Sequence, residues 1–169
     1  LYLEAAGAGF GRALCNLGWH FQVGHSVEKD EKRAFEYYEL AVEEGFIPAI
    51  AALAECWLKG IGCKADRSHA IELLYIGAEK GDACSQCELG KLLSEEGGES
   101  LDDAIGFLKM SASQKYPEGM YQMARHYYEG RGIYRDYHKA RELCEELVTM
   151  EIRDNLKERV LKLLNSLNQ

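Results

Sequence analysis

The sequence has no long hydrophobic run and no recognisable targeting segment at its start. A membrane-spanning helix needs about 20 consecutive apolar residues, and no stretch of the chain approaches that length. The opening lacks the basic, apolar and small-residue regions of a signal peptide. It begins at Leu1 without Met, which leaves room for a targeting segment upstream.

The chain is also short of positive charge. Lys and Arg together number 20 against 28 Asp and Glu, giving a formal net charge of −8. Such a balance repels phosphate backbones and anionic lipid, so we expect no nucleic-acid partner and no insertion into a membrane. The 169 residues are 47% apolar, which excludes a disordered acidic tail and predicts one folded domain.

A disulfide framework is not indicated by the cysteines. Their spacing is irregular, and the chain is long enough to form a core without cross-links. We expect free, buried thiols and a reduced compartment, which favours the cytoplasm. The six cysteines are Cys15, Cys56, Cys63, Cys84, Cys87 and Cys144.

What the sequence does contain is an internal repeat. A shift of 36 residues places Leu17 on Leu53 and then on Leu89, and a further shift of 34 reaches Met123. Each unit reads as two amphipathic helices, because its small and apolar residues recur at spacings of 4, 5 and 8. The predicted inward stripes of the first helices are Ala13, Leu17, Gly18 and Phe21; Ala49, Leu53, Ala54 and Trp57; Ser85, Leu89, Gly90 and Leu93; and Gly119, Met123, Ala124 and Tyr127.

Glycine and aspartate punctuate each unit between its two helices. In the second unit Gly60 is placed to end the first helix with positive φ, Cys63 to insert below the turn, and Asp66 to cap the second helix. The same positions are Gly24, Val27 and Asp30 in the first unit and Gly130, Ile133 and Asp136 in the fourth. In the third unit Ser100 takes the capping position, with Asp103 completing a capping box.

These units define the predicted organisation. Residues 1–10 match the second helix of a repeat, so the chain is expected to begin with a half-repeat. The C-terminal segment has apolar residues on one face and charges on the other, as expected of a helix that caps a stack of repeats. The predicted repeats are 11–46, 47–82, 83–116 and 117–150, followed by a capping helix over 151–169.

The pattern A-x3-LG-x2-Y-x2-G-x-GV-x2-D-x3-A-x3-Y-x2-A resembles the Sel-one-like repeat (SLR), a relative of the tetratricopeptide repeat. It is most complete in 49–81 and 119–148, whereas the third unit lacks the glycine turn. The resemblance implies an all-α fold, a right-handed α/α superhelix (α-solenoid) of antiparallel helix pairs whose first helices line a concave surface. It also implies a non-enzymatic scaffold or adaptor that binds proteins or peptides, without a cofactor.

If the first helices line the groove as in tetratricopeptide proteins, fixed offsets from each repeated leucine select the groove residues. Several of them are aromatic or cationic, types that often anchor interfaces, so we hypothesise that the groove binds an acidic or carboxylate-bearing segment. The alternative is that they are ordinary solvated residues, with nearby glutamates cancelling the positive charge. The candidate partner-binding residues are Arg12, Trp19, Gln22, Glu55, Lys59, Lys91, Tyr121, Arg125 and Tyr128.

Enzymatic and metal sites find little support. The stretch "GAGFGRA" lacks the third glycine and the preceding strand of a dinucleotide-binding fingerprint. Cys84 and Cys87 form a C-x-x-C pair, but structural zinc joins two such pairs, so thiol or metal chemistry there is the weakest alternative. The histidines show no catalytic signature. The main rival to a scaffold is a regulatory or tethering module of a larger enzyme or membrane protein.

Overall fold

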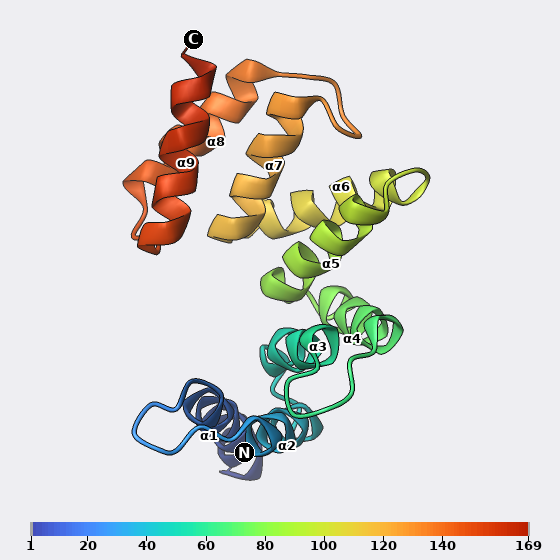
Figure 1. The fold of residues 1–169 in the computed structure, drawn as a ribbon, viewed down its shortest axis with the longest axis vertical. Coiled ribbons are helices and arrows are strands. Elements are labelled where there is room, and N and C mark those ends of the chain that lie inside the picture. Colours follow the sequence, from blue (N-terminus) through green and yellow to red (C-terminus); the bar gives the residue numbers. More distant parts are fainter. Residues whose placement is uncertain (1, 169) are drawn as a thin grey trace. The chain divides into compact units, whose positions relative to one another are not determined.

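The structure, a computed structural model, describes the backbone of residues 2–168 and the side chains of residues 9–168. Within this range all regular secondary structure is α-helical, which confirms the predicted fold class (Figure 1). Leu1 and Gln169, the outer ends of the predicted half-repeat and capping helix, lie outside the described residues. The helices are α1 (Tyr2–Val23), α2 (Glu31–Glu43), α3 (Ala49–Lys59), α4 (Arg67–Glu79), α5 (Ala83–Glu96), α6 (Ser100–Ser113), α7 (Pro117–Glu129), α8 (Tyr137–Thr149) and α9 (Asp154–Leu167).

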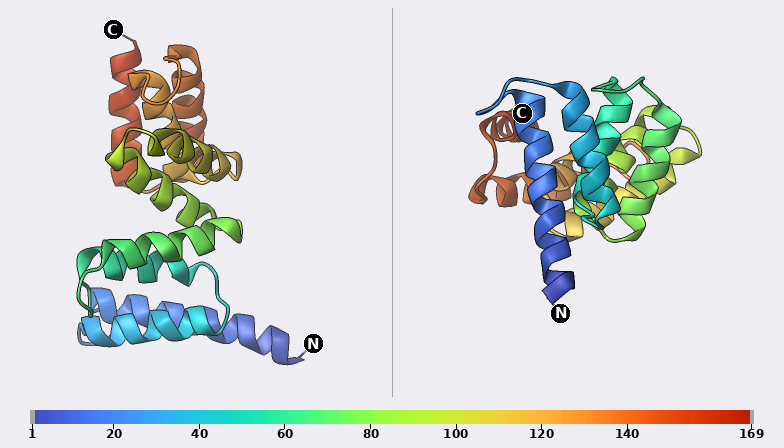
Figure 2. Two further views of the ribbon diagram at one scale, coloured as in Figure 1. Left: turned by 90° about the vertical axis from the view of Figure 1, so that its right-hand side faces the viewer. Right: turned by 90° about the horizontal axis from the view of Figure 1, so that it is seen from below.

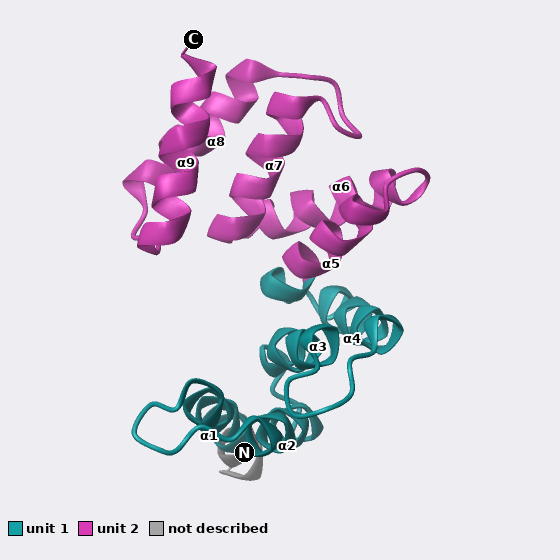
Figure 3. Ribbon diagram, in the orientation of Figure 1, with its two compact units in different colours: residues 1–85 teal, residues 86–169 magenta. Residues whose placement is uncertain are grey.

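The chain forms two compact units, residues 1–85 and 86–169 (Figure 3). In unit 1, α1 packs against α2, α2 against α3, and α3 against α4. In unit 2, α6 packs against α7, α7 against α8, and α8 against α9. Within unit 1, successive helices run in opposite directions (Figure 2). No helix among the described residues combines the length and apolar character needed to cross a bilayer.

Three of the connections within helix pairs share one loop structure. After α3, Gly60 ends the helix with φ 72°, and the Asp66 N–H donates to the Trp57 carbonyl at 2.8 Å. The Asp66 carboxylate accepts from the His69 N–H at 3.1 Å and caps α4. Asp30 and Asp136 cap α2 and α8 in the same way, so the predicted caps are confirmed.

The connection between α5 and α6, in the third repeat, differs from the prediction. The expected capping role of Ser100 is wrong, because α6 begins at Ser100 and the residue before it, Glu99, has helical φ and ψ and makes no capping hydrogen bond. Gly97 and Gly98, with φ 70° and 59°, reverse the chain within three residues. The third unit is two residues shorter than the first two, as its shift of 34 indicates, and this short connection leaves no place for an extended capping residue.

Small residues allow the helices to approach closely. Ala34, Ala70, Ala104 and Ala140, at the first inward turn of the second helices, are all 0% exposed. The repeated leucine packs on the second helix of the preceding pair, since Leu53 lies in one cluster with Phe35 and Tyr38. In unit 1 the α3–α4 pair is thus held to α2 of the pair before it as well as within itself.

The first repeat departs from this rule. Leu53, Leu89 and Met123 are 5%, 0% and 2% exposed as predicted, but Leu17 is 40% exposed, so its predicted interior position is wrong. Leu53 is covered by α2, whereas no described helix pair precedes α1 to cover Leu17. In α1 the buried apolar position is Leu14 instead.

At its start the chain has one helix where the sequence predicts two. The predicted half-repeat (1–10) and the first helix of the next repeat together form the continuous helix α1. Gly45 and Gly81 end their helix pairs with φ 77° and 85°, while Gly9, their equivalent in the repeat, is helical. The backbone therefore makes no turn at the expected junction.

Loop glycines also connect neighbouring pairs in unit 1, which gives a test of this packing. A Cβ added at Gly62 would lie 2.1 Å from the Glu31 carbonyl oxygen, whereas a Cβ at Gly45 would meet nothing within 4 Å. Both glycines have positive φ. We predict that Gly45→Ala lowers the free energy of unfolding by about 1 kcal/mol and that Gly62→Ala lowers it by about 1–3 kcal/mol more.

Chemical denaturation of the two variants measures this difference. Equal losses of stability would show that the loop of the second pair does not press on the start of α2.

Candidate functional site

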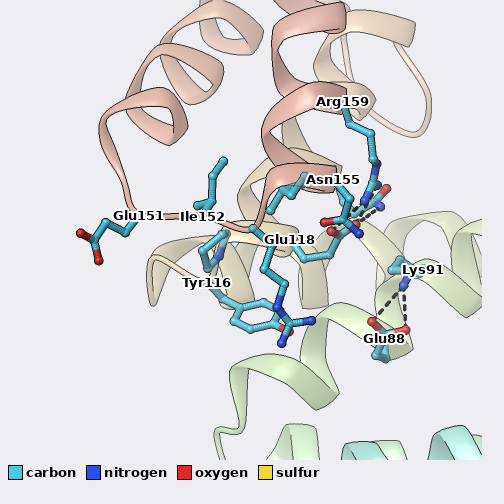
Figure 4. A pocket seen from close by; sticks show the side chains of 12 residues that line it. Glu88, Lys91, Tyr116, Glu118, Glu151, Ile152, Asn155 and Arg159 are labelled. Carbon is cyan, nitrogen blue, oxygen red and sulfur yellow. Dashed lines mark hydrogen bonds and ion pairs between the residues drawn. The ribbon is translucent and has the colours of Figure 1, made fainter. Parts of the chain in front are cut away.

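Unit 2 contains a cleft of about 460 Å³. Its walls come from α5, from the start of α7 with the residue before it, and from the start of α9 with its preceding loop (Figure 4). Its volume lies in the range of small-molecule sites and suits a few side chains of a protein segment. The lining residues are Glu88, Lys91, Tyr116, Pro117, Glu118, Gln122, Glu151, Ile152, Arg153, Asn155, Leu156 and Arg159.

The first charged group on the cleft wall is an ion pair on α5. The Lys91 ammonium donates to both carboxylate oxygens of Glu88, at 2.9 and 2.8 Å. The side chains of Lys91 and Glu88 are 33% and 31% exposed. Burial alone would lower the pKa of Lys91, but the hydrogen bond and the charge of Glu88 outweigh it and raise the pKa. Lys91 is therefore protonated, and the carboxylate of Glu88 balances its charge within the cleft.

The second ion pair joins α7 to α9. The Arg159 guanidinium donates to both oxygens of Glu118, at 2.9 and 3.0 Å, and lies 4.3 Å from the centre of the Tyr121 ring. Gln122 donates to the same carboxylate at 2.8 Å. Burial tends to raise the pKa of Glu118, but these hydrogen bonds and the Arg159 charge lower it overall. This two-point contact fixes α9 against the cleft wall.

Apolar and exposed groups complete the cleft. The side chains of Tyr116, Ile152 and Leu156 contribute apolar surface, and Leu156 is 7% exposed. Asn155 is exposed in the first turn of α9, and Glu151 points away from the two ion pairs (Figure 4). The lining has three carboxylates and three cations, so the cleft is polar but carries no net charge.

Of the predicted partner-binding residues, Lys91 lines this cleft. Tyr121 is only 8% exposed, because Arg159 and the capping helix cover it. Arg125 is paired with Glu129 at 2.9 Å on the same helix, and Tyr128 is half-buried beside the ring of Tyr137 at 5.6 Å. The structure therefore places the candidates of unit 2 in different surroundings.

The candidates in unit 1 are similarly varied. Lys59 and Glu55 pair with each other on α3, and Gln22 accepts a hydrogen bond from the Tyr38 hydroxyl at 2.7 Å. Arg12 is exposed, and Trp19 is 49% exposed with its ring 5.1 Å from that of His20. Among the candidates of unit 1, Trp19 is the large aromatic residue whose side chain is exposed enough to contact a partner.

Cys84 and Cys87 both lie in α5. Cys87 is 0% exposed and packs with Leu108 and Met123, and Cys84 is half-buried. None of the six cysteines, all of which lie within the described residues, forms a disulfide, and burial raises the pKa of Cys56 to about 12 and that of Cys144 to about 11. Among the described residues no three His, Cys, Asp or Glu side chains converge to hold a metal ion.

Sequence reasoning missed Glu88, Glu118 and Arg159. The pairing of Glu118 with Arg159 joins positions 41 residues apart, across the loop that leads into α9. No local pattern marks such a pair. The sequence offered one signal for such a contact, the charged residues in the first turns of the predicted capping helix, which include Arg159.

Comparison with known proteins relates this architecture to one family. The model of the Sel1 repeat matches residues 11–46, 47–82 and 117–147. A comparison with curated proteins gives no significant match.

Solved structures with this repeat have a similar fold. A protective antigen of uropathogenic Escherichia coli strains with an SLR fold is 27% identical, with a TM-score of 0.73 over 88% of this chain and 32% of its own. This chain therefore spans about a third of that antigen. A Sel1 repeat protein from Oxalobacter formigenes is 21% identical, with a TM-score of 0.75 over 99% of this chain and 76% of its own. One from Klebsiella pneumoniae is 22% identical, with a TM-score of 0.58 over 98% and 81%. The last two likenesses concern the fold alone.

The Glu118–Arg159 contact has a measurable pH signature. Since the folded-state pKa of Glu118 is below its usual value of 4.5, its contribution to stability is present above that pH and is lost as the pH falls through the lowered pKa. We predict that Glu118→Gln lowers the free energy of unfolding at pH 7 by about 1 kcal/mol and that the deficit shrinks below about pH 4.

Urea titrations of the wild type and Glu118→Gln at several pH values measure this effect. The control is Glu146→Gln, which removes the exposed pair with Lys115 and should change stability by less than about 0.5 kcal/mol. A deficit of Glu118→Gln that stays constant down to pH 3 would contradict the assignment.

Proposed function

We propose that this chain, which belongs to the Sel1 repeat family, is a protein-interaction scaffold. Its cleft in unit 2 is proposed to bind a segment of a partner protein. Sel1 repeat proteins are commonly scaffolds of this kind, and the repeat fold is generally non-enzymatic. The cleft adds a specific place for the partner.

The observation that carries this proposal is that a cleft of this volume has charged side chains already held in place by ion pairs. The Glu118–Arg159 contact and the Glu88–Lys91 pair hold the charged side chains in place before a partner arrives. A site whose side chains are already ordered loses less conformational entropy on binding. Ile152 and Tyr116 supply apolar surface beside these polar groups, as interface centres commonly do.

The partner segment is proposed to carry a carboxylate. Within the cleft such a group would meet Lys91, which lies on α5, and Arg153, which directly precedes α9. Because Lys91 is already paired with Glu88, the partner's carboxylate would share this ammonium rather than neutralise an isolated charge. We expect this interaction to set orientation and specificity more than affinity.

Lys59 and Arg125 are weaker candidates for the same contact. Each is paired with a glutamate on its own helix, and a partner would have to displace Glu55 or Glu129 to reach it. Exposed pairs of this kind contribute only about 0–1 kcal/mol, so displacement is feasible but gains little. The cleft around Lys91 is the better site, since apolar surface lies next to the charge.

A matched pair of substitutions on α9 tests the cleft. Asn155 lines the cleft, and Asn165 is exposed on the same helix away from it. Random peptides of about twelve residues, selected for binding to the wild-type chain, provide the probe. We predict that Asn155→Trp, which fills the cleft, weakens the selected peptides at least about tenfold, while Asn165→Trp leaves their affinity unchanged.

Fluorescence anisotropy with labelled peptides measures the affinities, and thermal unfolding confirms that both variants are folded. Selection of no peptide whose binding depends on Asn155 would remove the cleft from the proposal.

A further inference from the structure

Two exposed aromatic side chains lie at the connection between α7 and α8. Tyr134 is 95% exposed and Tyr137 is 49% exposed. A side chain as exposed as Tyr134 buries almost no surface on folding, so it gives the folded state little hydrophobic stabilisation. Its presence calls for a reason other than packing within this chain.

The other two loops of the same structure act as internal controls. In those loops the place of Tyr134 is taken by Glu28 and Lys64, and the place of Tyr137 by Glu31 and Arg67. The helix-ending glycines still have φ 73°, 72° and 69°, and an aspartate caps the following helix in all three. The loop therefore folds equally well with charged residues at both tyrosine positions.

The surroundings of the tyrosines are positively charged. Residues 130–139 carry three cationic side chains and one carboxylate, a net charge of +2 in a chain whose net charge is −8. The equivalent residues 24–33 carry three of each and are neutral. The Arg135 guanidinium lies 5.9 Å from the centre of the Tyr137 ring.

Hydrogen bonds hold this surface in a defined shape. Arg131 donates to the Ser94 carbonyl of α5, and the ring nitrogen Nδ1 of His126 lies 2.8 Å from the Arg131 carbonyl. Arg135 donates to the Glu129 carbonyl at 3.3 Å. Next to Tyr134 a shallow hollow is lined by Gly130, Gly132 and Ile133. The loop thus presents an ordered apolar hollow beside aromatic rings and cations.

We propose that this tyrosine loop, defined by Ile133, Tyr134, Arg135 and Tyr137, is a second docking surface, for an acidic protein segment with an aliphatic side chain. The aliphatic group would occupy the hollow between Ile133 and Tyr134. The carboxylates would face Arg135 and Arg131, whose guanidinium groups have more N–H donors than their backbone contacts use. Tyr and Arg are the residue types that most often dominate interface energetics.

This surface is separate from the cleft. The cleft lies at the start of α7 and the tyrosine loop follows its end, and the 13 residues of the helix set them about 18 Å apart. Binding at one place can therefore be measured while the other is blocked.

Two pools of random peptides of about twelve residues are the probes. One contains only Asp, Glu, Leu, Ile, Ser and Gly, and in the other Lys and Arg replace the acidic residues. We expect the full chain to select peptides from the acidic pool and not from the basic one. We also expect the affinity of the selected peptides to fall when NaCl is raised from about 0.05 to 0.5 M.

Variants built from the homologous loops separate the rings from the charge. Tyr134→Glu with Tyr137→Glu copies the first loop, and Tyr134→Lys with Tyr137→Arg copies the second. We expect both double variants to unfold at the wild-type temperature. We expect each to bind the acidic peptides at least about tenfold more weakly than the wild type does, the glutamate variant more so.

Several results would overturn the proposal. Wild-type affinity in the Lys and Arg variant would show that charge alone attracts the peptides. Loss of binding on Asn155→Trp would place the peptides in the cleft and support only the proposed function. Failure to select any acidic peptide, or a wild-type dimer in sedimentation that Tyr134→Glu disperses, would remove an acidic segment as the occupant.

Discussion

Close contact between helices at small residues is the constraint on which both units depend. The four alanines at the first inward turn of the second helices are fully buried. In α5 the close position is taken by Gly90, where an added Cβ would lie 2.7 Å from the Leu108 side chain. In unit 1 this separation allows Leu53 to reach the preceding helix pair, where it packs with Phe35 and Tyr38. A helix of 11 to 14 residues is marginal alone in water, so these contacts rather than helix propensity keep α2 to α9 folded.

Features encoded within a few residues could be predicted from the sequence. Asp30, Asp66 and Asp136 cap their helices because an N-cap depends on a side chain and an N–H three residues away. Predictions that depend on a neighbour were less secure. Leu17 has the right residue type for the interior, but its burial requires a helix pair that no described residue supplies.

The cleft shows the same limit for function. Tyr121 was selected by a rule for groove-facing positions, which holds only where nothing covers the first helix; here α9 lies over it and Arg159 covers its ring. Glu118 and Arg159 are surface-type residues in the sequence, and only the packing of α9 on α7 brings them together. The C-terminal helix therefore serves two roles, since it covers apolar residues such as Met120 and also forms one wall of the cleft.

Repetition offers a way to separate folding requirements from functional ones without any relative for comparison. A residue type that recurs at one position of all three loops of the same structure, such as the capping aspartate, is explained by the loop's own structure. A residue that breaks the recurrence while the backbone stays the same is not explained by folding. Tyr134 is such a residue, because the backbone that carries it also accommodates Glu28 and Lys64. An exposed ring on a positively charged loop that hydrogen bonds hold in place is readily explained by contact with another molecule.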